Sequence, residues 1–486
     1  MTVDRRNFLM GIGASVAATG MNATTANALP ITRGTKPLNV VLMICDDLGF
    51  GDSGCYGSQI PTPNLDRLAA QGTRCMRYNS AHPICSASRA ALLTGRYAPR
   101  SHTEGAIFPS STSGMSLDET TLANLFHNKG YRTHAIGKWH LGQAPGYLPT
   151  NRGFDTYLGV PYSVDMKPLP MFHNLTIAEP ETNRDELTPR YTAEAVQRLE
   201  EKSDSPFFMY LAYSYPHDPA RGSKNFSGRS AFGDVGDAIE EIDWSVGQVL
   251  DTLERTGHTE DTVVIFTSDH GPWFQGAHGA TRGRKGSTFE GGVRVPFIIR
   301  WPGHVPSATV CSEWLCSLNV LPTLAAWCGL EQPKLPLDGF DMSETLLRRQ
   351  TSPAKPVLYF TPAGNKDDLH GIRSAAWKLR IAQCTGEIYT NDHTMGSNNY
   401  LLARPELYHL ENDPTESYDV AKKHPDTVRH LLAELNREIA TFPPATRAEY
   451  AHLLTQKASI VTPPGASPRI LTGPEPDWAW EEPERR

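Results

Sequence analysis

Residues 38–45 form an almost uninterrupted apolar run that leads directly into Asp46 and Asp47. A strand that is apolar on both faces must be covered on both faces, as in sheets that lie between helices. Further candidates for buried strands lie at residues 133–136, 207–212, 262–267 and 295–300. Helical patterns separate them, at residues 64–71, 88–93, 121–129, 238–255 and 318–327. This alternation predicts an α/β fold with a parallel or mixed sheet flanked by helices.

The pattern changes near residue 350. A polar break with prolines is followed by short strand-like pieces at residues 357–360, 371–382 and 406–410, and then by an amphipathic helix at 425–441. We therefore expect a large domain at residues 37–350 and a small α+β C-terminal subdomain at residues 356–456, an antiparallel sheet with a helix. Residues 457–486 are rich in proline and predict a tail without regular structure.

The first 28 residues have the character of an export signal. Arg5 and Arg6 precede a weakly apolar stretch at residues 8–18, and Ala26-Asn27-Ala28 offers a small-x-small cleavage pattern. The stretch is too short and too polar to span a bilayer. The pattern resembles a twin-arginine (Tat) signal, which implies the Tat export machinery as a partner and a periplasmic or secreted bacterial protein. The alternative is a disordered tail with a chance arginine pair.

Charge and cysteine spacing exclude some classes of function. The net charge is −7 and no long basic run is present, so nucleic acid is not an expected partner. Eight cysteines occur without any CxxC pair, which argues against a zinc finger. In an oxidising compartment some of them could pair, but their spacing does not give the connectivity.

Two predicted strands end in groups that can bind a metal. Asp46 and Asp47 follow the first strand, and Asp269 and His270 follow the strand at residues 262–267. Ligands of open α/β sheets bind at the carboxyl ends of the strands, so these side chains are expected to converge. Three carboxylates and an imidazole suit a divalent cation such as calcium or magnesium. Taken alone, an Asp-Asp pair after a strand is more often a helix cap or a turn.

Cys85 stands just ahead of a predicted helix. A group at a helix N-terminus faces unpaired backbone N–H donors and the positive end of the dipole, which favours an anion. A buried thiol in a capping loop is the alternative.

Three segments together resemble the type I, formylglycine-dependent sulfatase family. Residues 83–95 resemble its signature, a cysteine with an arginine four positions later and a Thr-Gly end. Residues 130–140 and 284–296 resemble two further blocks, and smaller echoes lie at residues 64–69, 216–219 and 407–414. The resemblance runs in order from about residue 37 to residue 423, nearest to the arylsulfatase A and N-acetylgalactosamine-6-sulfatase types. It implies an alkaline-phosphatase-like α/β fold.

The resemblance also implies a cofactor and a modification. A maturation enzyme would oxidise Cys85 to formylglycine, whose hydrated aldehyde is the nucleophile of the family. One calcium ion would be held by the modified residue together with four ligands, Asp46, Asp47, Asp269 and His270.

The remaining roles follow from the same resemblance. Arg89 would steady the nucleophile, and Lys138 and Lys285 would bind sulfate oxygens. His140 would hydrogen-bond the second diol oxygen and take its proton, and His217 would lie near the leaving oxygen. These roles suit the chemistry, because fixed cations in a pocket without water stabilise a polyanionic transition state.

Two positions depart from the usual family pattern. Ala87 stands where many members have proline, which leaves open the maturation enzyme that accepts this chain. His270 stands where asparagine is usual, and imidazole is a softer ligand than an amide oxygen. Because three carboxylates remain, calcium is favoured over zinc or manganese.

The substrate is less constrained than the reaction. Specificity lies in loops, which carry no transferable code. A sulfated carbohydrate is the leading interpretation, with aryl sulfates as surrogate substrates. The alternatives are a phosphoester or phosphonate monoester hydrolase of the same superfamily and a non-catalytic sulfated-glycan binding protein.

Overall fold

The computed structural model describes residues 37–103, 105–353, 355–363, 366–384 and 399–455. The expected signal segment at residues 1–28 and the expected tail at residues 457–486 lie outside these ranges. Among the helices of the described ranges, none is both long enough and apolar enough to cross a bilayer.

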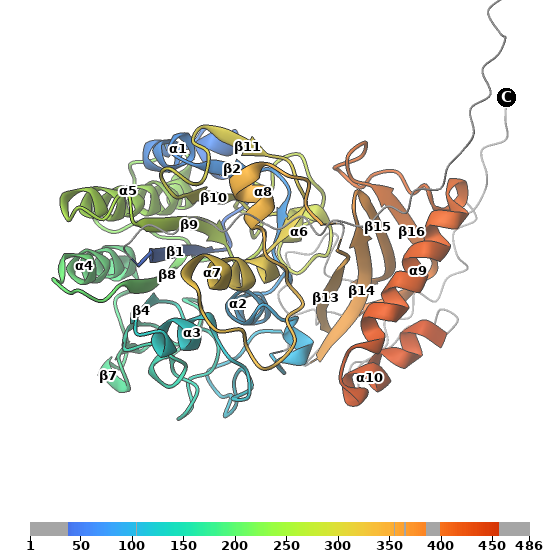
Figure 1. Cartoon of the computed structure of the whole chain (residues 1–486), viewed down its shortest axis with the longest axis horizontal. Coiled ribbons are helices and arrows are strands. Elements are labelled where there is room, and N and C mark those ends of the chain that lie inside the picture. The colour runs from blue at the N-terminus through green and yellow to red at the C-terminus, as the bar shows by residue number, and fades with distance from the viewer. Residues whose placement is uncertain (1–36, 104, 354, 364–365, 385–398, 456–486) are drawn as a thin grey trace, which may run out of the picture. The chain divides into compact units, whose positions relative to one another are not determined.

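A ten-stranded mixed sheet forms the centre of the large domain, in the order β11-β2-β10-β9-β1-β8-β4-β5-β6-β7. Its strands are β1 (Asn39–Asp46), β2 (Thr73–Cys75), β4 (Arg132–Gly137), β5 (Thr156–Gly159), β6 (Met171–His173), β7 (Thr176–Glu179), β8 (Phe207–Pro216), β9 (Thr262–Ser268), β10 (Phe297–Arg300) and β11 (Thr309–Cys311). β1 lies between β8 and β9 and is parallel to both (Figure 1). All eight residues of β1 are buried, as its apolar run predicts. A two-stranded sheet, β3 (Tyr78–Asn79) and β12 (Leu315–Cys316), lies apart from it.

Helices cover both faces of the large sheet. They are α1 (Pro63–Ala70), α2 (Cys85–Thr94), α3 (Leu122–Asn128), α4 (Leu187–Glu200), α5 (Gly233–Arg255), α6 (Glu290–Val293), α7 (Val320–Cys328) and α8 (Ser343–Arg348). Side chains of α1, α4 and α5 share one core cluster with Met209 of β8. Phe208, the next residue of β8, stacks on Phe126 of α3 at 4.5 Å between ring centroids. Neighbouring residues of a strand point to opposite faces, so α3 and α4 cover different sides of the sheet.

The C-terminal part is a four-stranded antiparallel sheet with two helices. The strands are β13 (Val357–Ala363), β14 (Lys366–Ser374), β15 (Trp377–Cys384) and β16 (Asn399–His409), and the helices are α9 (Pro425–Ala440) and α10 (Pro444–Thr455). Leu431, Leu435 and Ile439 of α9 are buried in the core cluster that also holds strand residues of this sheet.

The structure confirms the predicted fold class and adds elements that the patterns did not indicate. α4 was not predicted, because Pro189 and several polar residues interrupt its apolar pattern. Proline is tolerated there since it lies in the first turn, where the backbone N–H has no intrahelical partner. Residues 371–382, predicted as strand-like, include the turn between β14 and β15, and α10 is a second helix beside the expected one.

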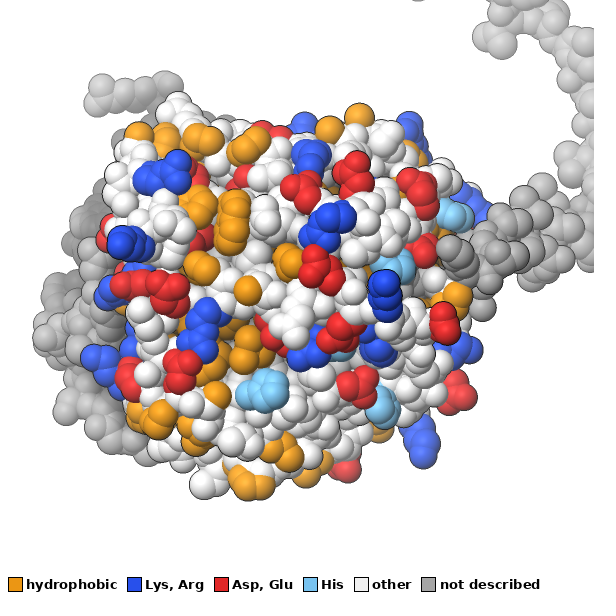
Figure 2. All heavy atoms as spheres, turned by 90° about the vertical axis from the view of Figure 1, so that its left-hand side faces the viewer, with side chains coloured by type: hydrophobic (Ala, Val, Ile, Leu, Met, Phe, Trp, Pro, Cys, Tyr) orange, Lys and Arg blue, Asp and Glu red, His pale blue; other side chains and the backbone are white. Residues whose placement is uncertain are grey.

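Surface charge is mixed on the face that carries the outer ends of α4 and α5. Figure 2 shows basic and acidic side chains of the described residues interspersed there with neutral and apolar ones.

Candidate active site

The carboxyl edge of β1 and β9 brings the acidic residues together. The two strands are parallel and in register, with Cys45 opposite Ser268, so Asp46 and Asp269 leave the sheet side by side. Asp47 has a left-handed backbone (φ 66°), and its N–H donates to Oδ1 of Asp269 at 3.2 Å. The chain therefore turns directly after the strand and keeps both carboxylates at this edge.

Cys85 is the first residue of α2, and its side chain faces the same edge. Its Sγ lies 3.2 Å from Nε2 of His270 and 3.5 Å from Oδ1 of Asp46. The residue is only 3% exposed. A helix of ten residues thus directs its positive end at the acidic cluster.

Four of the predicted ligands could hold one metal ion. Asp46, Asp47, Cys85 and His270 are buried, and each offers one ligand atom within 4.8 Å of the others. Nδ1 of His270 lies 2.9 Å from the carbonyl of Gly271 and donates to it, so Nε2 is the ring nitrogen that faces the cluster. Burial opposes protonation of His270, but Asp269 and Cys85 raise its pKa to about 9. The cluster offers carboxylate oxygens and an imidazole nitrogen, and its negative groups favour a positive charge at this place. Both features fit a divalent cation.

Asp269 lies beside this cluster rather than within it. Its Oδ2 accepts a hydrogen bond from Nε of Arg89 at 3.1 Å, and its Oδ1 accepts the N–H groups of Asp47 and His270. Oδ1 is 3.6 Å from Nε2 of His270. Its role as a metal ligand remains a prediction.

Three cations line the carboxylates. Nζ of Lys138 donates to Asp46, and Nζ of Lys285 lies 2.8 Å and 3.0 Å from the two carboxylate oxygens of Asp47. Burial alone would raise the pKa of Asp46, but Lys138 and other neighbouring cations hold it well below its ordinary value. Arg89 pairs with Asp269 in the same way, so three carboxylates face three cations. A divalent ion would add a positive excess, which favours an anionic ester.

His140 contacts a backbone carbonyl rather than Cys85. Its Nε2 lies 3.0 Å from the oxygen of Ile107, so Nε2 carries the proton, and Nδ1 has no hydrogen-bond partner among the described residues. Burial and the charge of Lys138 hold the pKa of His140 well below its ordinary value. The imidazole is therefore neutral, with a free lone pair on Nδ1.

His217 follows β8 and reaches the cluster from the other side of β1. Its Nδ1 lies 2.6 Å from the carbonyl of Asp218, and its Nε2 lies 3.8 Å from Oδ2 of Asp47. All the predicted site residues are thus placed at one edge of the sheet.

The sulfatase family model matches residues 38–330, which include every one of these side chains. This chain belongs to the sulfatase family. It is accordingly an enzyme of the sulfuric ester hydrolase class. The chain is 36% identical over 486 residues to human arylsulfatase A, a match that covers 89% of this chain and 94% of the relative. It is 34% identical over 431 residues to rat N-acetylgalactosamine-6-sulfatase, covering 79% and 81% of the two chains.

Solved structures share the fold of this sulfatase. PsFucS1 sulfatase from Pseudoalteromonas sp. is 26% identical with a TM-score of 0.76, and the match covers 85% of this chain and 91% of that one. Ps i-CgsB, solved in complex with k-i-k-neocarrahexaose, is 28% identical with a TM-score of 0.71, covering 83% and 92%.

Some supporting residues of this sulfatase were not predicted. Ser268 accepts the N–H of Leu48 at 3.0 Å and donates to the carbonyl of His270 at 3.1 Å, so it joins the two turns that carry the acidic cluster. Its position directly before Asp269 in the sequence is a signal that could have identified it as a supporting residue. Ile107, whose carbonyl orients His140, lies in a loop without a recognisable pattern.

The loop that carries Lys285 is held from the C-terminal sheet. Thr361 of β13 donates its hydroxyl to the carbonyl of Gly286 at 2.8 Å. The N–H of Gly286 donates to the carbonyl of Pro83 at 2.9 Å, two residues before Cys85. The C-terminal sheet thus supports both the lysine and the start of the cysteine helix.

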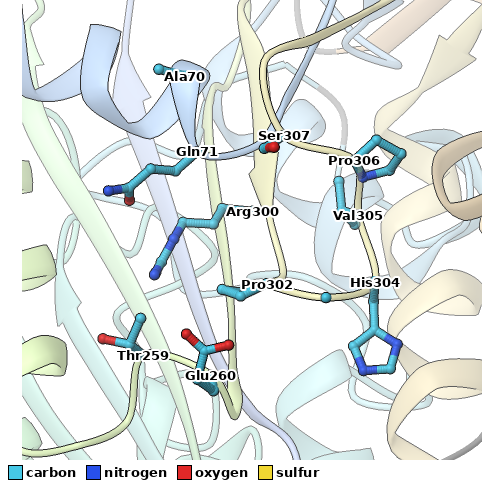
Figure 3. Close-up of a pocket in the computed structure, with 11 residues that line it drawn as sticks. Ala70, Gln71, Thr259, Glu260, Arg300, Pro302, His304, Val305, Pro306 and Ser307 are labelled. Carbon is cyan, nitrogen blue, oxygen red and sulfur yellow. The ribbon is translucent and has the colours of Figure 1, made fainter.

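One surface pocket of this sulfatase lies away from these residues. Its volume is about 670 Å³, and its lining includes Gln71, Glu260, Arg300 and His304 (Figure 3). β10 is antiparallel to β9, so Arg300 at its end lies near the edge where β9 begins. The pocket is therefore not part of the candidate active site.

Proposed function

We propose that this sulfatase is exported by the Tat route and hydrolyses a sulfate ester of a carbohydrate, using a formylglycine made from Cys85 and one calcium ion. The observation that carries the proposal is the position of Cys85 between Asp46 and His270, with three cations beside it. A carbohydrate substrate is supported by the N-acetylgalactosamine-6-sulfatase relative and by the solved complex with k-i-k-neocarrahexaose. Aryl sulfates would serve as surrogate substrates.

Asp46, Asp47, Asp269 and His270 would hold the calcium together with the residue made from Cys85. When bound, the ion supplies positive charge that neutralises the sulfate oxygens. The carboxylates outnumber the single imidazole, which favours a hard cation.

Formylglycine, once hydrated, supplies an oxygen nucleophile with a second hydroxyl in place of the thiol. Arg89 is positioned to orient this residue, because its guanidinium is fully buried and is fixed by Asp269 at 3.0 Å and by the carbonyl of Lys138 at 3.1 Å. Nδ1 of His140 is the proton acceptor, since it is neutral and has a free lone pair.

Lys138 and Lys285 bind sulfate oxygens, in contacts shared with the carboxylates that they already touch. Nε2 of His217 donates a proton to the departing oxygen. Its Nδ1–H is held by the carbonyl of Asp218, which leaves Nε2 directed at the cluster, 3.8 Å from Oδ2 of Asp47.

Protein produced beside a formylglycine-generating enzyme tests the proposal. Peptide mass analysis should show formylglycine at position 85, and the protein should cleave nitrophenyl sulfate. Cys85→Ala should lower kcat by more than about 10³-fold with an unchanged thermal melt. Full activity of this variant would rule out Cys85 as the source of the nucleophile.

The same preparation separates the alternative functions. A sulfatase should prefer nitrophenyl sulfate to nitrophenyl phosphate and to phosphonate monoesters by kcat/KM. The reverse preference would assign a phosphoester or phosphonate hydrolase. Binding of sulfated glycans without turnover by the matured protein would assign a binding protein. A panel of defined sulfated sugars, with the released position read by mass spectrometry, would then identify the substrate.

A further inference from the structure

Cys75 and Cys311 lie opposite one another on neighbouring strands. β2 and β11 pair in parallel with Cys75 opposite Cys311, at the edge of the large sheet (Figure 1). Side chains of directly paired residues in a parallel ladder point to the same face, and their Cα atoms are about 5 Å apart, within the range that a disulfide requires. The backbone holds this register, because the N–H of Met76 donates to the carbonyl of Cys311 at 2.8 Å.

The two thiols differ in access. Cys75 is fully buried, whereas Cys311 is partly exposed and lines a surface pocket of about 160 Å³. The same pocket is lined by Thr345 and Leu346 of α8 and by Arg349. A small oxidant can therefore reach Cys311 in the folded protein, but it cannot reach Cys75 directly.

The thiols already interact. A hydrogen bond between them raises the pKa of Cys75 and lowers the pKa of Cys311. Burial adds to the increase at Cys75. The more accessible sulfur is thus also the one that ionises more readily, and thiolate is the reactive form.

We propose that Cys75 and Cys311 are a redox site that forms a disulfide between β2 and β11 when the folded chain meets a small disulfide oxidant. The pair lies apart from Cys85, and the inference does not depend on the sulfatase reaction. It gives two of the eight cysteines a partner that their spacing could not identify.

The exchange balances with the oxidant as the only co-reactant. The thiolate of Cys311 attacks one sulfur of the oxidant, whose S–S bond breaks and releases one thiol. The sulfur of Cys75, losing its proton, then attacks Cys311 in the mixed disulfide. The bond between Cys75 and Cys311 forms and a second thiol leaves. Two protein thiols are oxidised and one disulfide is reduced to two thiols.

Such a bond would secure an edge of the sheet. β11 has no strand on its outer side in the described sheet, and it contributes only three residues to the ladder. The bond would close a loop between positions 75 and 311, and a long closed loop restricts the unfolded chain strongly.

The experiment uses the full chain, first reduced and then incubated with oxidised glutathione. Remaining thiols are alkylated, and peptides are mapped by mass spectrometry without reduction. We expect one linked species that joins Cys75 to Cys311, reversed by dithiothreitol, and a thermal midpoint that rises by on the order of 5 °C on oxidation. Cys311→Ser should abolish both changes. Cys55→Ser, which removes a partly exposed thiol outside the pair, should keep both.

Three results would overturn the proposal. Both thiols could remain open to alkylation after oxidation, either one could pair with a different cysteine, or glutathione could stay on Cys311 without release. The mapping of the wild-type chain decides among these results even where Cys311→Ser does not fold.

Discussion

Sγ of Cys85 lies 3.2 Å from Nε2 of His270, across 185 positions of the chain. The contact joins the start of α2 to the end of β9, so it depends on how the helix is docked on the sheet. It also places the proposed site of modification against the ring nitrogen of His270 that faces the acidic cluster. A ligand and the precursor of the nucleophile therefore share one cation site in the proposed mechanism.

The proposed cation can be tested by removal and return. Chelation should abolish turnover and lower the thermal midpoint, and calcium should restore both better than zinc or manganese, because carboxylates dominate the donor set. Differential scanning fluorimetry and turnover of nitrophenyl sulfate measure the two effects. His270→Asn, which supplies an amide oxygen, should keep the preference for calcium. Restoration by zinc and not by calcium would show that His270 has changed the metal.

His217 should matter most for poor leaving groups. A sugar alkoxide needs a proton as it departs, whereas a nitrophenolate leaves without one. His217→Ala should therefore slow a sugar sulfate by about 10²-fold or more, and nitrophenyl sulfate much less. Comparison of kcat for the two substrates measures the difference. Equal losses would mean that His217 only shapes the pocket, and would point to Lys285 as the contact of the leaving oxygen.

The hydroxyl of Thr361 should support the Lys285 loop. Thr361→Val keeps the shape of the side chain but leaves the carbonyl of Gly286 without this donor. A lost hydrogen bond is worth about 1 kcal/mol, so kcat/KM should fall about 5-fold. Thr361→Ser, which retains the hydroxyl, is the matched control and should recover most of the rate. Identical kinetics of the valine and serine variants would contradict the role of this bond.

Asp52 should make the folded state less stable at higher pH. Burial raises its pKa to about 6. The hydrogen bonds that its carboxylate accepts from the N–H groups of Ala277 and Gly49 act in the opposite direction but are weaker than the effect of burial. The folded state then binds more protons than the unfolded state between about pH 4 and pH 6. The contribution of Asp52 to stability is complete below that window and is lost as the pH rises through 6.

Asp52→Asn removes this titration. In urea unfolding, the wild-type protein should lose about 1 to 2 kcal/mol more than the variant between pH 5 and pH 8. Groups that titrate alike in both proteins contribute equally to the two free energies of unfolding, so their contributions cancel in the difference. Parallel pH profiles would show that the carboxyl of Asp52 is not protonated in the folded state.

Much of the fold could be predicted because its signals are local. The buried strands β1, β8 and β9 are largely apolar runs, and α5 has a strong helical period. Short strands such as β6 and β7 have too few residues for a periodic pattern. α10 was missed since its apolar residues do not gather on one side.

The sequence by itself determined the fold class, the family motifs and the strand ends that carry Asp46, Asp47, Asp269 and His270. Only the tertiary structure decided that Asp269 is engaged by Arg89, that the free nitrogen of His140 is Nδ1, and that Cys75 faces Cys311. Strand and helix patterns arise from neighbouring residues, whose side-chain period is set by the backbone. Contacts between residues hundreds of positions apart depend on strand register and loop docking, which no local pattern contains.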